Sequence, residues 1–157
     1  MLPYFSGERT PINDPKAKGV IFGLGLHHTR DHIYNACLEG IGYGIASHIR
    51  IFNELHAGTS KIMAVGGGTK HAKWLQIVSD ICGCEQHVAR EGIGAAFGDA
   101  LLAGLGAGLF RTPEDLAGHI QTKRSVTPDE TTHRLYQACF QNYIALYEST
   151  KHIMHSV

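Results

Sequence analysis

The sequence predicts an α/β layered domain, because segments with the pattern of strands alternate with helical segments. An apolar run at 61–65 ends in three consecutive glycines and leads directly into a helical pattern over 71–82. A second strand is expected over 85–90, followed by a helix rich in alanine and glycine over 93–105. Small residues in that last helix predict that it lies close to a sheet.

A long helix is expected before the first strand. Thr29 is its predicted cap, and the helical pattern continues to about Leu55. Upstream, residues 1–18 contain Pro and Gly and are expected to be extended, while 19–26 form a short apolar run interrupted by glycines. The apolar residues at helical spacing predict the buried face of the long helix: Ile33, Cys37, Ile41, Ile45, Ile49 and Phe52.

Two Thr-Pro sequences predict the starts of the last two helices. Thr112 is the expected cap of a short helix with Pro113 in its first turn. Thr127 is expected to open a capping box with Glu130, at the start of a final helix that reaches about His152.

Length and charge limit the classes of function. The 157 residues suit one domain, and 14 basic residues are balanced by 14 acidic ones, which argues against a nucleic-acid binder. We see no signal peptide and no apolar run long enough to cross a membrane, so a cytoplasmic protein without membrane contact is expected. The four cysteines show neither metal-site spacing nor a disulfide framework.

The junction at residues 66–71 has the strongest functional signal. Glycines allow unusual backbone angles and let a ligand approach without meeting a β-carbon. A strand that runs through Gly66, Gly67 and Gly68 into a helix therefore predicts a nucleotide site, with Thr69 as the expected helix cap. The same glycines would also suit tight packing or a plain turn, and spacing alone does not separate these interpretations.

The sequence gives weaker signals for two other ligand classes, a dinucleotide and a metal ion. Glycines at 92, 94 and 98 come close to a dinucleotide fingerprint but miss its spacing by one residue, which argues against an NAD-linked enzyme. His28 and His32 lie one helical turn apart, but no third ligand follows at a fixed spacing. No metal ligand is assigned.

Three blocks in order resemble the C-terminal domain of the FGGY family of carbohydrate kinases, most closely its xylulose kinase branch. The first block is Leu2-Pro-Tyr-Phe-Ser-Gly-Glu-Arg-Thr-Pro11. The second runs from Gly19 through Gly23-Leu24 and His32-Ile33 to Leu38-Glu39. The third is Gly66-Gly-Gly-Thr-Lys70, followed by Trp74, Gln76 and Ser79-Asp80.

The resemblance implies an actin-like, ribonuclease-H-like ATPase fold and transfer of phosphate from ATP, with Mg²⁺, to a sugar hydroxyl. It implies that Gly66, Gly67 and Gly68, with Thr69, hold the adenosine part of ATP. The polar position at the start of the following helix falls at His71, where family members more often have Ser or Asn.

The resemblance also implies that the domain is incomplete. Members of the family are far longer, and their sugar pocket and catalytic aspartate lie in an N-terminal domain outside this chain. We therefore assign no catalytic residue here and expect the isolated chain to be inactive. Xylulose or a related pentulose is the expected substrate of the complete protein.

In a complete protein, further strands would pack against this domain. The chain alone is therefore expected to expose a sheet edge or an apolar patch, which would permit a homodimer. The alternative function is a nonenzymatic nucleotide-binding or assembly module that retains the kinase fold.

Overall fold

The computed structural model describes residues 1–56, 61–90 and 94–157, and it has the predicted α/β architecture. The elements are, in order, α1 (Arg30–Glu54), β1 (Lys61–Ala64), the 3₁₀ helix η1 (Gly67–Lys70), α2 (Ala72–Cys82), β2 (Glu85–Ala89), α3 (Ala95–Gly106), α4 (Pro113–Ala117), β3 (Thr122–Val126) and α5 (Glu130–Met154). The strand order is β1-β2-β3, with β1 parallel to β2 and β3 antiparallel to β2.

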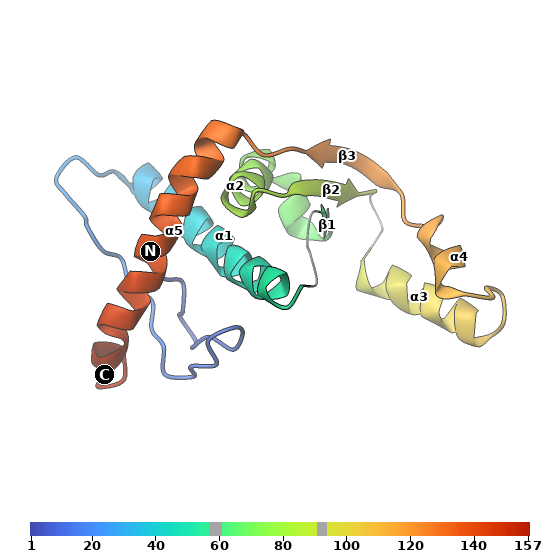
Figure 1. Ribbon diagram of the computed structural model, residues 1–157, viewed down its shortest axis with the longest axis horizontal. Coiled ribbons are helices and arrows are strands. Elements are labelled where there is room, and N and C mark those ends of the chain that lie inside the picture. Colours follow the sequence, from blue (N-terminus) through green and yellow to red (C-terminus); the bar gives the residue numbers. More distant parts are fainter. Residues whose placement is uncertain (57–60, 91–93) are drawn as a thin grey trace.

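The helices divide into two groups (Figure 1). Helix α2 connects the two parallel strands and packs against both α1 and α5. Helices α3 and α4 extend away from this group, beyond the sheet, and neither packs closely against another element of the described residues. None of the helices in the described ranges is long and apolar enough to cross a membrane.

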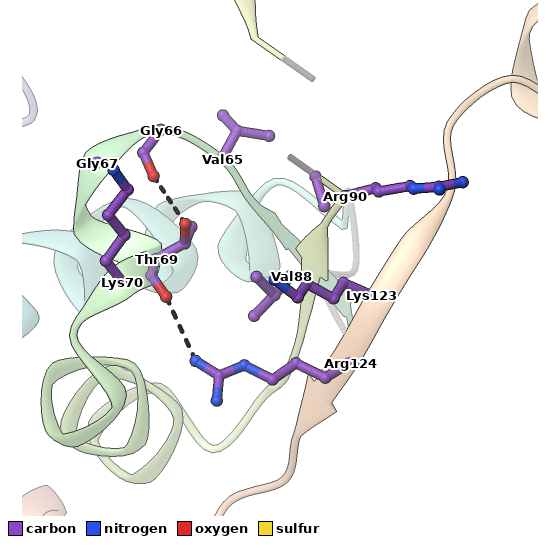
Figure 2. Close-up of a pocket in the computed structure, with 10 residues that line it drawn as sticks. Val65, Gly66, Gly67, Thr69, Lys70, Val88, Arg90, Lys123 and Arg124 are labelled. Atoms are coloured by element: carbon purple, nitrogen blue, oxygen red, sulfur yellow. Dashed lines mark hydrogen bonds between the residues drawn. The ribbon is translucent and has the colours of Figure 1, made fainter. Parts of the chain in front are cut away.

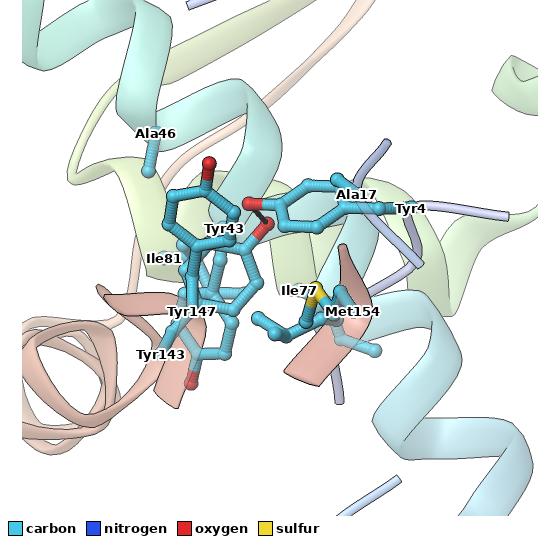
Figure 3. Packing of buried hydrophobic residues seen from close by; sticks show 10 residues of the cluster. Tyr4, Ala17, Tyr43, Ala46, Ile77, Ile81, Tyr143, Tyr147 and Met154 are labelled. Carbon is cyan, nitrogen blue, oxygen red and sulfur yellow. Dashed lines mark hydrogen bonds between the residues drawn. The ribbon is translucent and has the colours of Figure 1, made fainter. Parts of the chain in front are cut away.

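The main core lies between the N-terminal segment and helices α1, α2 and α5 (Figure 3). Tyr4 and Tyr143 meet there, and the Tyr143 hydroxyl donates a hydrogen bond of 2.7 Å to the Tyr4 hydroxyl. The segment 1–18 has no regular helix, as predicted, yet it contributes to this core. The buried members of the cluster are Leu2, Tyr4, Ala17, Tyr43, Ala46, Ile77, Ile81, Tyr143, Tyr147 and Met154.

Asp14 attaches the N-terminal segment to α5. Its Oδ2 atom accepts hydrogen bonds of 2.7 Å from the Tyr147 hydroxyl and 2.7 Å from Nε2 of His155. The Lys16 backbone N–H donates to the other carboxylate oxygen at 3.0 Å. The hydrogen bond from His155, aided by those from Tyr147 and Lys16, lowers the pKa of Asp14 to about 2.

The predicted buried face of α1 is partly wrong. Ile41 and Phe52 are 41% and 49% exposed, whereas small residues of the helix are buried. A β-carbon on Gly40 would lie 2.8 Å from the Met1 carbonyl oxygen, and one on Gly42 would lie 2.7 Å from Ile81. Close approach therefore selects the glycine side of α1, which a count of large apolar residues does not detect.

The helix caps are correct in two cases and wrong in two. Thr29 and Thr112 cap α1 and α4 as predicted. The cap of α5 is Asp129, whose carboxylate accepts a 2.8 Å hydrogen bond from the Thr132 N–H, instead of Thr127. The cap of α2 is His71 instead of Thr69, because η1 occupies the residues between the glycines and α2.

Two features of the second half differ from the predictions. The predicted close packing of α3 on a sheet is wrong: in the described residues only Gly104 of this helix is buried, beneath the Phe110 ring. Strand β3 was not predicted, because its sequence Thr-Lys-Arg-Ser-Val lacks an apolar face. Part of the predicted turn into α3, including Gly92 and Ile93, lies outside the described residues.

Candidate functional site

A cleft of about 760 Å³ opens between the turn that follows β1 and the strands β2 and β3 (Figure 2). Parallel strands commonly place binding sites at their carboxyl ends, and the turn after β1 is such a position. The residues around the cleft are Val65, Gly66, Gly67, Thr69, Lys70, Val88, Ala89, Arg90, Lys123 and Arg124.

Thr69 holds the glycine turn in shape. Its hydroxyl donates a 2.7 Å hydrogen bond to the Gly66 carbonyl, and its backbone N–H donates to the same oxygen at 3.2 Å. Because both hydrogen bonds close the same turn, the backbone around Gly67 has a fixed shape before any ligand arrives. The Thr69 side chain therefore shapes the turn.

The structural constraint that favours glycine differs among the three glycines of the turn. Gly66 has a φ of +85°, a conformation that L side chains rarely adopt. A β-carbon on Gly68 would overlap a ring carbon of Trp74, so packing explains this glycine. Gly67 has neither constraint, because a β-carbon there would meet no atom of the described residues within 4 Å.

Two of the predicted site residues do not line the cleft. Gly68 faces the Trp74 ring, as its close contact requires. His71 caps α2 by accepting a 3.2 Å hydrogen bond at Nδ1 from the Trp74 N–H, and its Nε2 lies 3.4 Å from the Tyr34 hydroxyl. Both ring nitrogens of His71 therefore have partners within the chain.

Basic side chains form one side of the cleft, a feature that the sequence prediction missed. Figure 2 shows Lys123 and Arg124 reaching from β3 toward the glycine turn, whereas the Arg90 side chain points away from it. Arg124 Nη2 donates a 3.3 Å hydrogen bond to the Thr69 carbonyl oxygen. The charged side chains among the described residues around the cleft are all basic.

The cleft also has apolar surface. Val65, which follows β1, is 51% exposed at its edge, and Val88 of β2 is buried beneath it. Open backbone at Gly67, apolar valine side chains and basic side chains thus meet in one concave surface. This combination matches a ligand that has an apolar part and an anionic part.

The basic residues were hidden in the sequence because β3 was hidden. Once β3 is placed beside β2, with Val88 opposite Arg124, the consecutive Lys123 and Arg124 come to the glycine turn. One sequence signal for this strand was available. Thr122 and Val126, which flank the adjacent basic residues, are residue types that favour strands.

The described residues do not fit a metal ion held by the protein. Across the described part of the chain there is no group of three or more His, Cys, Asp or Glu residues arranged for a metal. Magnesium prefers oxygen ligands, usually carboxylates and phosphates, and the cleft has no described carboxylate. A magnesium ion in this cleft would therefore depend on oxygens other than those of these side chains.

Comparison of the sequence with known proteins finds carbohydrate kinases. Residues 1–107 match the profile of the FGGY family of carbohydrate kinases, C-terminal domain. The xylulose kinase of Escherichia coli (strain K12) is 33% identical over 154 residues, which cover 98% of this chain and 32% of that protein. A glycerol kinase of Coxiella burnetii (strain Dugway 5J108-111) is 36% identical over 128 residues, covering 82% of this chain and 26% of that protein.

A solved structure extends the likeness to the fold. The crystal structure of xylulose kinase from Rhodospirillum rubrum matches 98% of this chain and 31% of its own chain, with a TM-score of 0.83 and 28% identity. The chain therefore belongs to the FGGY family of carbohydrate kinases and corresponds to their C-terminal domain. The predicted family and α/β fold are confirmed, and the chain spans about a third of the length of these xylulose kinases.

Proposed function

We propose that this chain is the ATP-binding C-terminal part of a carbohydrate kinase that transfers the γ-phosphate of ATP to a sugar hydroxyl. Xylulose or a related pentulose is the proposed acceptor, because several of the relatives are xylulose kinases. The nucleotide binds in the cleft beside the glycine turn.

Gly67 is the observation that carries this proposal. The structure explains Gly66 by its backbone angle and Gly68 by Trp74, but no contact with the described residues requires a glycine at position 67. Gly67 lines the cleft, and close approach of a ligand to the backbone at that position would require a residue without a side chain. The family supplies the identity of that ligand, ATP.

The catalytic base lies elsewhere in this proposal. Phosphoryl transfer needs a base that orients the acceptor hydroxyl and cations that neutralise the transferring group. The described cleft residues include basic groups but no carboxylate. The chain alone is therefore inactive, and an N-terminal domain supplies the sugar site and the base.

A chimera tests the proposal. The matching C-terminal third of the Escherichia coli xylulose kinase is replaced by this chain, and ADP release is measured with a panel of ketopentoses and polyols. We expect sugar-dependent ADP release with at least one ketopentose. A chimera that carries Gly67→Val should fold equally well and lose at least about tenfold in kcat/KM, because the valine occupies the space that ATP needs.

A well-folded chimera that releases no ADP with any acceptor would contradict the kinase proposal. If that chimera still binds ATP, the result favours the alternative function, a nucleotide-binding or assembly module that has lost the reaction.

A further inference from the structure

We propose that His71 positions the glycine turn for the nucleotide through its neutral imidazole, so that the affinity of this chain for ATP falls between pH 8 and pH 5. The inference rests on the proposed function, because it concerns the same nucleotide. It gives His71 a positioning role that acts through the backbone, since the side chain does not line the cleft.

His71 joins three elements of the fold. Its backbone N–H donates to the Gly68 carbonyl oxygen at 3.1 Å, at the end of η1. Its side chain caps α2, because Nδ1 accepts a 3.2 Å hydrogen bond from the backbone N–H of Trp74. Its Nε2 atom lies 3.4 Å from the hydroxyl of Tyr34 on α1. The path of the chain from the glycine turn into α2 therefore depends on this one residue.

The cap requires the uncharged form of the ring. A backbone N–H can only donate, so the Nδ1 atom that accepts from Trp74 carries no proton. In the neutral imidazole the proton is then on Nε2, which faces the Tyr34 hydroxyl and can donate to it. A second proton would have to bind at Nδ1. It would break the cap and place a positive charge at the N-terminus of α2, where the helix dipole is already positive.

Histidine is the side chain whose charge ordinarily changes between pH 5 and 8. The other titratable or charged groups beside His71 are of different types. Tyr34 faces it from α1, whereas Lys70 and Lys73 flank it in η1 and α2. Arg124 of β3 reaches the turn through a hydrogen bond to a backbone carbonyl oxygen. Tyrosine, lysine and arginine ordinarily keep their protons over this range, so the expected change is that of the imidazole.

Helix α5 also brings a histidine to α2, at the far end of that helix. His133 Nδ1 lies 2.7 Å from the Asp80 carbonyl oxygen, in the last turn of α2. Protonation there would leave the cap at His71 in place. Variants of His71 therefore separate its contribution to any pH dependence from that of His133.

A histidine cap has a simpler explanation, in which it only stabilises α2. Serine and asparagine are common caps and would serve that purpose at any pH. The simpler explanation predicts lower stability at acid pH without a change in the ATP affinity of the folded chain. The position of His71 argues for more, because the same residue ends the turn whose Gly67 lines the cleft.

The experiment measures ATP affinity by calorimetry at pH 8 and pH 5.5, on the full chain and its variants, where urea titration shows each to be folded. ATP itself gains a proton over this range, so each affinity is compared with that of His71→Asn, whose cap does not titrate. The two proteins should agree within about twofold at pH 8. At pH 5.5 the unmodified chain should bind about three- to tenfold more weakly than His71→Asn, the range expected for loss of one helix cap.

Two further variants assign the effect. His71→Ala has no cap and should bind ATP more weakly than His71→Asn at both pH values. His152→Asn replaces an exposed histidine near the end of α5 and should keep the pH dependence of the unmodified chain.

Trp74, the single tryptophan, gives a second measurement that needs no nucleotide. Its backbone N–H donates to the cap, and its ring lies against Gly68. The fluorescence of the unmodified chain should therefore change with a midpoint between pH 5 and 8. That change should be lost in His71→Asn and retained in His152→Asn.

The outcomes separate this inference from the proposed function. Equal pH dependence of ATP affinity in the unmodified chain and His71→Asn would overturn the inference and leave ATP binding intact. Unchanged affinity in His71→Ala, or the same fluorescence transition in His71→Asn, would overturn it as well. A folded chain that binds no ATP at either pH would contradict the proposed function, and with it any role of His71 toward the nucleotide.

Discussion

Helices α1, α2 and α5 bury a common core together with the N-terminal segment, whereas α3 and α4 leave most of their side chains uncovered. Tyr143, at the centre of the first group, is 5% exposed and has aromatic neighbours. In the second group, Leu102 of α3 is 63% exposed although the helix is strongly apolar. The first group thus has a core that it shares with the N-terminal segment, and the second has the surface of a helix that another part of a protein would cover.

The cleft lies between the turn after β1 and strands β2 and β3, and its glycines share features of both groups. Gly68 is packed like the first group, because the Trp74 ring fills the space beside it. Gly67 is open like the second. The contrast supports the proposal that this chain works as part of a longer kinase, since a chain spanning about a third of its relatives has surface left for other segments. The following substitutions test the comparison, beginning with the largest expected effect.

Tyr143→Ala should have the largest effect on stability. It removes a buried ring and the hydroxyl that donates to Tyr4, so the free energy of unfolding should fall by about 3 to 5 kcal/mol in urea titrations. Tyr143→Phe is the control, because it keeps the ring and removes only the hydrogen bond, and it should cost about 1 kcal/mol. Equal losses in both variants would contradict a core that depends on aromatic packing.

Gly68→Ala and Gly67→Ala form a matched pair at the cleft. The alanine at position 68 must displace the Trp74 ring, which should cost about 1 to 3 kcal/mol and shift the fluorescence of the single tryptophan. The alanine at position 67 meets open space, so stability and fluorescence should stay close to those of the unmodified chain. The reverse order would mean that Gly67 is the glycine required for packing.

Asp14→Asn should weaken the attachment of the N-terminal segment in a pH-dependent way. The folded-state pKa of Asp14, about 2, lies below its ordinary value of 3.8, so its charge stabilises the fold above pH 3.8. That contribution is lost as pH falls toward 2. The urea midpoint of the variant should therefore lie below that of the unmodified chain at pH 6, and the gap should narrow between pH 4 and 2.

Leu102→Gln should have the smallest effect. Because the Leu102 side chain is mostly in water, the free energy of unfolding should change by less than about 0.5 kcal/mol. Leu75→Ala, at a position 4% exposed on α2, is the contrast and should cost about 2 to 5 kcal/mol. A large loss at Leu102 would show that α3 is packed in solution.

The sequence predicted the elements better than it predicted what each face contacts. Helical periodicity placed α1, α2 and α5 within a few residues, since it depends on local spacing. It misplaced the buried face of α1, because the decisive residues there are Gly40 and Gly42, which carry no hydrophobic signal. The caps of α2 and α5 are His71 and Asp129, and local sequence patterns did not identify them because they depend on the turns that precede each helix.

The candidate site was half predicted. Gly66, Gly67 and Thr69 line the cleft as the motif suggested, and their contact with ATP stays a prediction. The basic side of the cleft, formed by Lys123 and Arg124 of β3, was missed. It depends on pairing between strands more than 30 residues apart in the sequence, which places Arg124 opposite Val88. Periodicity cannot detect such pairing in a polar five-residue strand.

Calorimetric titration of ATP into the chain and its Gly67→Val variant tests the central claim most directly. The account predicts measurable binding by the unmodified chain and loss of that binding in a variant that unfolds at a similar urea concentration, because the valine fills the open space beside the turn. Equal ATP affinity in both proteins would contradict the claim that Gly67 is open in order to admit the nucleotide.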